Sequence, residues 1–405
     1  MLRHYASPAV FEFSAPPPLS LYIHFPWCVS KCPYCDFNSH ALHDDLPENA
    51  YVEALLKDLE LELPAVWGRT VQTIFMGGGT PSLFSPAAIE RLLSGVRARL
   101  SVAPGAEITL EANPGTVELE RFAGYREAGV NRLSIGVQSF DDNQLRTLGR
   151  IHAAAQATDA GRAARAAGFD NFNLDLMFGL PQQTTAQAVA DLLTAVELQP
   201  AHLSWYQLTL EPNTLFHAHP PVLPDDDERW AIQQAGQSLL QEHGYTQYEV
   251  SAYARAGRIS QHNLNYWRFG DYLGIGAGAH GKITDAGAGT IRRTWRKRHP
   301  RAYLEAAGCS GFIDGQRQLS AEEALFEYAM NRLRLRQPFS LDEFEARSGL
   351  PRSWIIPILR QAEIDGLLTL DSETVRHSEK GWLFLDDLVA QFLPEVTCNA
   401  GNRPN

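Results

Sequence analysis

The sequence predicts an α/β protein with a partial (β/α)6, TIM-like barrel and a C-terminal α+β, winged-helix-like domain. Three observations support this fold class. Short apolar runs alternate with longer helical segments between residues 19 and 210. Polar or glycine-rich residues follow several of these runs in succession, as they do at the ligand face of a barrel. Near residue 319 the pattern changes to helical segments followed by a hairpin, which indicates a second, smaller domain.

Six short runs are predicted to form the strands of the barrel. The runs are mostly apolar, which is typical of parallel strands that are covered on both faces. The predicted strands are Leu21–Phe25, Val71–Met76, Glu107–Leu110, Arg132–Val137, Phe172–Phe178 and Leu203–Leu210. The helical segments between them include Glu53–Leu63, Ala87–Leu100, Val117–Ala128 and Ala186–Leu198. This alternation predicts one parallel sheet with helices packed against it.

Residues suited to binding or catalysis gather at the carboxyl ends of the predicted strands. Cys28 follows the first strand, Gly77–Pro81 follows the second, and Glu111 follows the third. Gln138 follows the fourth strand, and Asp175 lies within the fifth. Because the strands of a parallel barrel all end at one face, these residues are expected to line a shared pocket.

The rest of the chain divides into an irregular extension of the barrel and a small domain. We predict an N-terminal tail at 1–18, the core with its extension at 19–315, a C-terminal domain at 316–395 and a tail at 396–405. The C-terminal domain is expected to contain helices at Glu322–Arg334, Ser340–Arg347 and Arg352–Asp365, and a hairpin at Leu367–His377. Helices followed by a hairpin are the element order of a winged helix.

The charge balance argues against some classes of function. The chain of 405 residues carries a net charge of −12, whereas general nucleic-acid binders are basic. Residues 321–405 contain 14 acidic and 9 basic side chains, which disfavours DNA recognition by the small domain. No apolar run is long enough to span a bilayer, and the first residues do not look like a signal peptide. We therefore expect a cytoplasmic protein that does not bind nucleic acid.

Three closely spaced cysteines give the clearest chemical signal. Cys28, Cys32 and Cys35 follow the pattern Cys-x3-Cys-x2-Cys. Three thiolates can hold three irons of a cubane cluster and leave the fourth iron open, although most such clusters have four cysteine ligands. A zinc site completed by His24 or His40 is an alternative. A disulfide framework is disfavoured, because the chain is long and has five cysteines.

These motifs together resemble the radical S-adenosylmethionine (SAM) superfamily. The resemblance rests on the cysteine triplet, on Gly77–Pro81 and on Gly136–Ser139, each of which follows a predicted strand. More narrowly, the chain is similar to the oxygen-independent coproporphyrinogen III oxidase group from about Leu19 to the end of the last domain. The glycine run is not a P-loop, because no Lys-Ser or Lys-Thr follows it.

The resemblance implies a [4Fe-4S] cluster on the three cysteines, with SAM bound at the open iron. It also implies a set of residues that contact SAM or a second ligand beside it. These residues are Tyr22, Tyr34, Gly78, Gly79, Thr80, Glu111, Gln138, Arg150 and Asp175. Simpler interpretations are open for three of these features: a tight turn for the glycines, a surface charge for Arg150 and a buried polar strand residue for Asp175.

One departure from the oxidase pattern changes the expected function. The decarboxylating oxidases carry a further cysteine two residues after the third, and here that position is Phe37. This feature, and the segment His262–Trp267 with its His-Asn-x-x-Tyr-Trp pattern, resemble the sister group of HemW heme chaperones. Histidine can ligate heme iron, so His262 is a candidate heme contact; the alternative is a core histidine among aromatic residues. The basic run 292–298 could pair with heme propionates, but we expect it to form a solvated surface strip.

Two functions follow from the resemblance. The first is a heme chaperone that holds a [4Fe-4S] cluster and SAM, binds heme and passes it to an acceptor such as a respiratory, membrane-associated hemoprotein. The alternative is an oxygen-independent coproporphyrinogen III oxidase of heme biosynthesis. Phe37 and His262–Trp267 favour the chaperone, and they make oxidase activity unexpected although the radical SAM motifs are intact. A homodimer is compatible with the resemblance.

Overall fold

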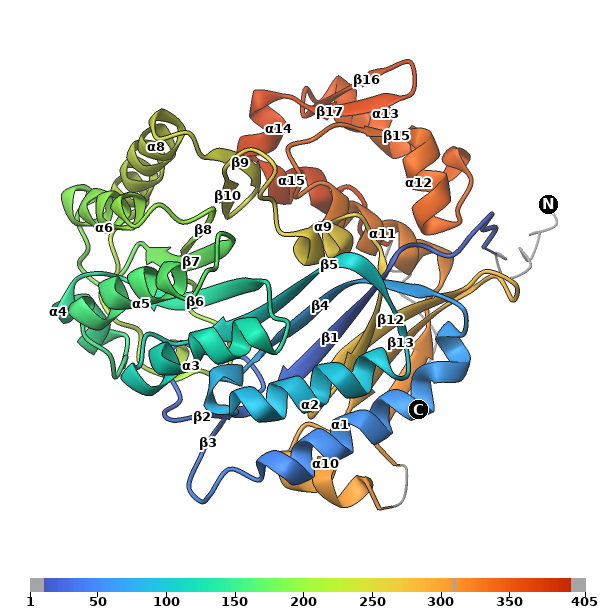
Figure 1. Cartoon of the computed structure of the whole chain (residues 1–405). Helices are drawn as coiled ribbons and strands as arrows, with labels where there is room; N and C mark the ends of the chain where they lie inside the picture. The colour runs from blue at the N-terminus through green and yellow to red at the C-terminus, as the bar shows by residue number, and fades with distance from the viewer. Residues whose placement is uncertain (1–10, 309–310, 395–405) are drawn as a thin grey trace, which may run out of the picture.

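A twelve-stranded sheet forms the centre of the computed structural model, which describes residues 11–308 and 311–394 (Figure 1). Its strand order is β14-β13-β12-β11-β1-β4-β5-β6-β7-β8-β10-β9. The parallel strands are β1 (Leu19–Phe25), β4 (Thr70–Gly78), β5 (Ser101–Ala112), β6 (Arg132–Gln138), β7 (Phe172–Phe178), β8 (His202–Gln207) and β11 (Asp271–Ile275). The six predicted strands are therefore confirmed, with β5 starting six residues earlier than expected.

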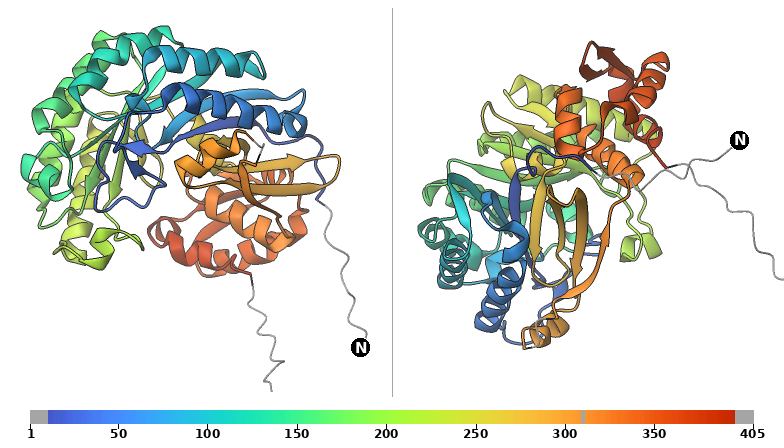
Figure 2. Two further views of the ribbon diagram at one scale, coloured as in Figure 1. Left: turned by 90° about the horizontal axis from the view of Figure 1, so that it is seen from below. Right: turned by 90° about the vertical axis from the view of Figure 1, so that its right-hand side faces the viewer.

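Burial on both faces explains why these strands run parallel. In β1 and β7, six of the seven residues are buried, and alternation between an inner and a solvent face is absent. The outer face of the sheet is covered by helices, most of which pack against the next helix along the sheet (Figures 1 and 2). These are α1 (Glu48–Glu62), α2 (Pro86–Arg97), α3 (Thr116–Glu127), α5 (Ala154–Ala166), α6 (Thr185–Glu197) and α8 (Asp226–Glu242). Within the described residues, no helix is both long and apolar enough to cross a membrane.

Further strands extend the sheet at both edges. They widen the inner face, which lies opposite the covering helices. Strand β11 pairs in parallel with β1, and β12 (His280–Asp285), β13 (Thr290–Arg296) and β14 (Ile313–Gln318) follow in antiparallel order. At the other edge, β10 (Ala252–Ala254) and β9 (Thr246–Glu249) pair antiparallel beyond β8. The strand order ends at β14 and β9, so the barrel is partial, as predicted.

The C-terminal elements form a second layer with a core of its own, drawn at the top of Figure 1. In order they are α11 (Ala321–Arg332), β15 (Phe339–Ser340), α12 (Leu341–Ser348), α13 (Ile356–Ile364), β16 (Leu368–Asp371) and β17 (Thr374–His377). The first three helices and the three-stranded sheet give the predicted winged-helix-like order, and α14 (Glu379–Leu383) and α15 (Leu385–Ala390) follow. The core also takes in Phe11 from the N-terminal segment and Phe269 from the barrel extension. The C-terminal tail predicted at 396–405 lies outside the described residues.

A buried carboxylate joins the extension to the barrel. Asp271, at the start of β11, is fully buried and accepts hydrogen bonds from Arg69 Nη1 at 2.8 Å and Lys282 Nζ at 3.0 Å. The amide and hydroxyl of Thr284 donate to the same carboxylate at 2.9 and 2.8 Å. Arg69 precedes β4, whereas Lys282 and Thr284 lie on β12. The carboxylate therefore fixes β12 against the parallel core.

Asp271→Asn should lower the free energy of unfolding by about 3–5 kcal/mol, because it leaves the buried ammonium of Lys282 without its counter-charge. Urea denaturation followed by circular dichroism measures the change. Asp170→Asn is the matched control, because Asp170 is exposed, and its effect should stay within about 0.5 kcal/mol. Equal stabilities of the two variants would contradict a structural role for the buried carboxylate.

Candidate functional site

The cysteine loop begins where β1 ends. Cys28 closes the short strand β2 (Trp27–Cys28), which pairs in parallel with β3 (His40–Ala41), and Cys32 and Cys35 lie on the loop between them. All three cysteines are free and partly buried. The amide of Cys35 donates to the carbonyl of Cys32 at 3.2 Å, which gives the loop a tight turn. The thiols are thus held at the carboxyl end of the first strand, as the sequence predicts.

Two positions at the end of β4 require glycine, both because neighbouring atoms lie close and because the backbone turns there. Gly78 has a φ of +110°, and a Cβ there would lie 2.3 Å from the ring of His24. A Cβ on Gly79 would lie 2.5 Å from the carbonyl oxygen of Trp27. The amide of Gly78 donates to Glu111 Oε2 at 3.0 Å. Because these positions carry no side chain, their backbone can lie close to a ligand between the cysteines and Glu111.

One cavity of about 520 Å³ brings most of the predicted site residues together. Its lining includes Cys28, Cys32, Cys35, Tyr34, Gly78, Gly79, Thr80, Glu111, Gln138, Arg150 and Asp175. We call it the cluster cavity. Tyr22 lines a neighbouring cavity that shares Gly78 and Glu111 with the cluster cavity, whereas His262 lines neither. Residues that are up to 147 positions apart in sequence (28 to 175) therefore meet at one face of the barrel.

Arg150 lies beside the cysteine loop rather than on the surface. Its Nη1 lies 3.7 Å from Cys32 Sγ, and its Nη2 donates to Asn113 Oδ1 and to the carbonyl of Gly136, both at 2.7 Å. Gln138, at the end of β6, has a φ of +70°, a backbone region that non-glycine residues seldom adopt. The hydroxyl of Tyr206 donates to Gln138 Oε1 at 2.8 Å. This strained residue thus has its side chain fixed in the cavity.

Two carboxyl groups stand close enough in the cavity to influence each other. Burial raises the pKa of Glu111 to about 7, and the nearby carboxylate of Asp175 adds to the shift. Burial also raises the pKa of Asp175, although Asn173 Nδ2 donates to it at 2.8 Å and Ser134 Oγ at 3.2 Å. Glu111 is therefore poised between its protonated and ionised forms near neutral pH.

Several polar residues of the cavity were not among the predicted site residues. They are Asn113, Ser134 and Tyr206, which fix Thr80, Arg150, Asp175 and Gln138 through hydrogen bonds. Asn173, which is buried and does not line the cavity, also donates to Asp175. Asn113 could have been found from its position two residues after Glu111, at the end of the same strand. Asn173 alternates with Asp175 on β7, so both side chains face the same side of the sheet. No signal in the sequence points to Tyr206.

The described residues fit a cluster better than a zinc ion. His24 has both ring nitrogens engaged: Nε2 donates to the carbonyl of Asn38 at 2.8 Å, so Nδ1 accepts the hydroxyl of Tyr22 at 2.9 Å. In the described part of the chain, no three His, Cys, Asp or Glu side chains converge on one metal ion. In a [4Fe-4S] cluster each cysteine binds a different iron, so such convergence is not needed. The glycine cradle and the buried, unpartnered Nε of Arg150 fit a further polar ligand beside it.

The basic run 292–298 is not the solvated strip that we expected. Arg293 forms an ion pair with Glu327, and Arg296 is buried and pairs with Asp58 and Glu62. The expectation is wrong because β13 is an inner strand of the extended sheet, with β12 on one side and β14 on the other. Cys309 and Cys398 lie outside the described residues.

Comparison with known proteins assigns the family. A protein of Escherichia coli (strain K12) named Heme chaperone HemW is 54% identical over 379 residues, which cover 94% of this chain and 99% of that protein. The chain belongs to the HemW family. Another HemW relative, from Bacillus subtilis (strain 168), is 33% identical over 93% of this chain and all of that protein. A bovine relative named Radical S-adenosyl methionine domain-containing protein 1, mitochondrial, is 34% identical and is covered over 88% of its length.

The family models and a solved structure place the HemW family within a larger group. Residues 22–193 match the radical SAM superfamily, and residues 319–384 match the HemN C-terminal domain. The solved structure of coproporphyrinogen III oxidase (HemN) from Escherichia coli, a radical SAM enzyme, has a TM-score of 0.78 at 24% identity. It covers 93% of this chain and 90% of its own, so the two proteins share a fold. Membership of the superfamily implies a [4Fe-4S] cluster and SAM.

The raised pKa of Glu111 predicts a pH effect on stability. The pKa of Glu111 in the folded protein, about 7, lies above its usual value of 4.5. Between these pH values the folded protein therefore binds more protons than the unfolded chain, and its stability falls as pH rises from 4.5 to 7. Glu111→Gln should remove this contribution, so the variant gains about 1–3 kcal/mol relative to the parent on going from pH 5 to pH 8. Urea denaturation of the metal-free parent and variant at both pH values measures this difference in the free energy of unfolding. A pH-independent difference between variant and parent would contradict the shift.

Proposed function

We propose that this protein is a heme chaperone that carries a [4Fe-4S] cluster and SAM, binds heme and passes it to an acceptor hemoprotein. The names of its full-length HemW relatives support this proposal. It includes a cytoplasmic setting and an acceptor of the respiratory, membrane-associated kind. The proposal excludes coproporphyrinogen III oxidase activity, which the HemN structure that shares the fold has in its name.

The position of Phe37 is the observation that carries the proposal. Its side chain is 62% exposed and lines both the cluster cavity and the neighbouring cavity. The decarboxylating oxidases have a thiol at this position, which a phenyl ring cannot replace as a donor of protons or electrons. An apolar ring at the junction of the two cavities is suited instead to contact with an aromatic ligand.

The chain's own residues would hold the cofactors in fixed positions. Cys28, Cys32 and Cys35 would ligate the cluster, and the guanidinium of Arg150 beside Cys32 would offset its negative charge. The partly buried backbone of the glycine run and the carboxyl of Glu111 would bind the polar groups of SAM. When bound, the cluster and SAM together supply electrons and a potential radical source.

The direct test is to reconstitute the cluster anaerobically and to measure heme uptake and coproporphyrinogen III decarboxylation on the same sample. We expect brown protein that takes up heme stoichiometrically and forms no protoporphyrinogen. The triple variant Cys28→Ser, Cys32→Ser, Cys35→Ser is the control, because it should lose the cluster and its absorbance while keeping the fold.

Robust formation of protoporphyrinogen by the reconstituted protein would contradict the chaperone proposal and support the oxidase alternative. Colourless protein that holds zinc after careful reconstitution would contradict the cluster itself.

A further inference from the structure

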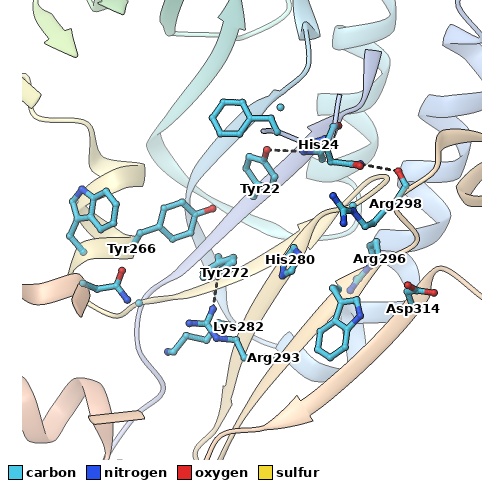
Figure 3. A pocket seen from close by; sticks show the side chains of 18 of the residues that line it. Tyr22, His24, Tyr266, Tyr272, His280, Lys282, Arg293, Arg296, Arg298 and Asp314 are labelled. Atoms are coloured by element: carbon cyan, nitrogen blue, oxygen red, sulfur yellow. Dashed lines mark hydrogen bonds between the residues drawn. The ribbon is translucent and has the colours of Figure 1, made fainter. Parts of the chain in front are cut away.

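A second, larger cavity adjoins the cluster cavity. Its volume is about 870 Å³, within the range of small-molecule sites, and it lies between the extended strands and the helices α9 (Gln261–Trp267) and α11 (Figure 3). The two cavities share Phe37, Gly78, Glu111 and Trp267. We call it the extension cavity. A ligand bound there would lie directly beside the cluster and SAM.

Aromatic side chains form much of the wall of the extension cavity. They are Tyr22, Phe37, Tyr266, Trp267, Phe269, Tyr272 and Trp295. The rings of Tyr266 and Tyr272 meet edge to face with centroids 4.5 Å apart, so they support each other in the wall. Large, fixed aromatic surfaces bind flat aromatic ligands well, because such contacts bury much apolar area at little entropic cost. The wall therefore fits a planar macrocycle better than a sugar or a peptide.

Among the described residues, the ion pairs of the extension cavity leave one cationic side chain without a carboxylate partner. Four cationic side chains line it: Lys282, Arg293, Arg296 and Arg298. Three of them are already held by carboxylates: Lys282 by Asp271, Arg293 by Glu327, and Arg296 by Asp58 and Glu62. Within residues 11–308 and 311–394, the guanidinium of Arg298 forms no ion pair, and the side chain is exposed. Arg298 is therefore suited to a carboxylate of the ligand.

His280 offers a free imidazole in the same cavity. It is the first residue of β12, its side chain is exposed, and Figure 3 shows it between Tyr272 and Arg298. Its ring lies 6.5 Å from that of Trp295, nearly parallel at 28°. In the part of the chain that the structure describes, neither ring nitrogen makes a hydrogen bond. Partial burial, with the charges of Arg293 and Arg298, lowers the pKa of His280, so the neutral form that binds metal is favoured.

The backbone that carries His280 is fixed by the loop of the cluster. Gly276 and Gly278 have φ values of +102° and +80°, and a Cβ on Gly278 would lie 2.3 Å from Asn38 Nδ2. This nitrogen donates to the carbonyl of Ala277 at 2.9 Å and to that of Arg298 at 2.8 Å. Asn38 follows the third cysteine by three residues. One amide thus holds both the turn before His280 and Arg298, two residues beyond the end of β13.

His262, by contrast, is closed off from any ligand in this structure. It is 1% exposed, and its ring stacks on Phe75 with centroids 5.0 Å apart. Because the hydroxyl of Thr73 donates to Ser20, Nδ1 of His262 donates to Thr73 at 2.8 Å and Nε2 accepts from Tyr266 at 3.0 Å. The lone pair that would bind iron is therefore already engaged. His262 instead orients Tyr266, whose ring lines the extension cavity.

We propose that the extension cavity is the heme site, with the imidazole of His280 on the iron and the guanidinium of Arg298 on a propionate. This inference rests on the proposed function and names the site where that function takes place. Heme has a flat macrocycle, two carboxylates and an iron that accepts a histidine ligand. The cavity offers an aromatic wall to the macrocycle, an imidazole to the iron and one guanidinium to a carboxylate. In this arrangement Tyr266 and Trp267 of the His-Asn-x-x-Tyr-Trp segment form part of the wall of the site, and His262 does not ligate the iron.

The first test is a heme titration of His280→Ala, followed by absorption and electron paramagnetic resonance spectra of the bound heme. We expect a loss of affinity of about tenfold or more and the loss of the spectral signature of an axial nitrogen. His219→Ala is the control, because His219 is exposed and lines neither cavity, and it should bind heme like the parent. Cluster content and circular dichroism show that each variant is folded.

The second test compares heme with its dimethyl ester, which lacks the carboxylates. Arg298→Ala should weaken heme by about tenfold and leave the ester unchanged, so the variant binds both alike. Arg301→Ala, a substitution at a solvent-exposed arginine three residues away, should keep the parent's preference for heme.

Three outcomes would overturn the inference. The first is that His280→Ala keeps the parent's affinity and axial nitrogen signature. The second is that the signature is lost in His262→Gln instead. The third is that Arg298→Ala keeps the parent's preference for heme over its ester. These outcomes leave the proposed function standing, because the parent still binds heme. A parent protein that binds no heme at all would overturn both the proposed function and the site.

Discussion

A short chain of hydrogen bonds joins the cluster loop to the rest of the structure. The hydroxyl of Tyr22 donates to His24, His24 donates to the carbonyl of Asn38, and Asn38 donates to Ala277 and Arg298. This series of hydrogen bonds starts on β1, passes through the loop after the cysteines and ends on the extension of the sheet. These bonds help to fix the position of the loop that carries the three thiols. Both cavities depend on that position.

The glycines around this hydrogen-bond chain follow from the same constraint. Gly78 leaves room for the ring of His24, Gly276 leaves room for the carbonyl of His24, and Gly278 leaves room for the amide of Asn38. Each has a positive φ as well, so a side chain would be strained even without a collision. Two glycine-rich segments that are about 200 residues apart in sequence therefore serve one purpose. They let the backbone approach the end of β1 from both sides.

Much of the core could be predicted from the sequence, because its signals are local. The apolar runs gave the parallel strands, and the rule that barrel ligands bind at strand ends brought Cys28, Glu111 and Asp175 to one cavity. The extension could not be predicted in this way, because β11 pairs with β1 across about 250 residues and no local pattern announces such a pairing. The basic run looked solvated for the same reason, since the partners of Arg296 come from α1. Likewise, a sequence motif containing His262 does not show that Thr73 and Tyr266 occupy its ring.

The central claim is that two adjoining cavities hold the cluster and the heme, with a shared wall at Gly78 and Glu111. Diffraction from crystals of the protein loaded with cluster and heme, recorded at the iron absorption edge, tests it most directly. We predict anomalous density for the cluster at Cys28, Cys32 and Cys35, and a separate iron within bonding distance of the His280 imidazole. A heme iron bonded to His262, or one lying outside the extension cavity, would contradict the account.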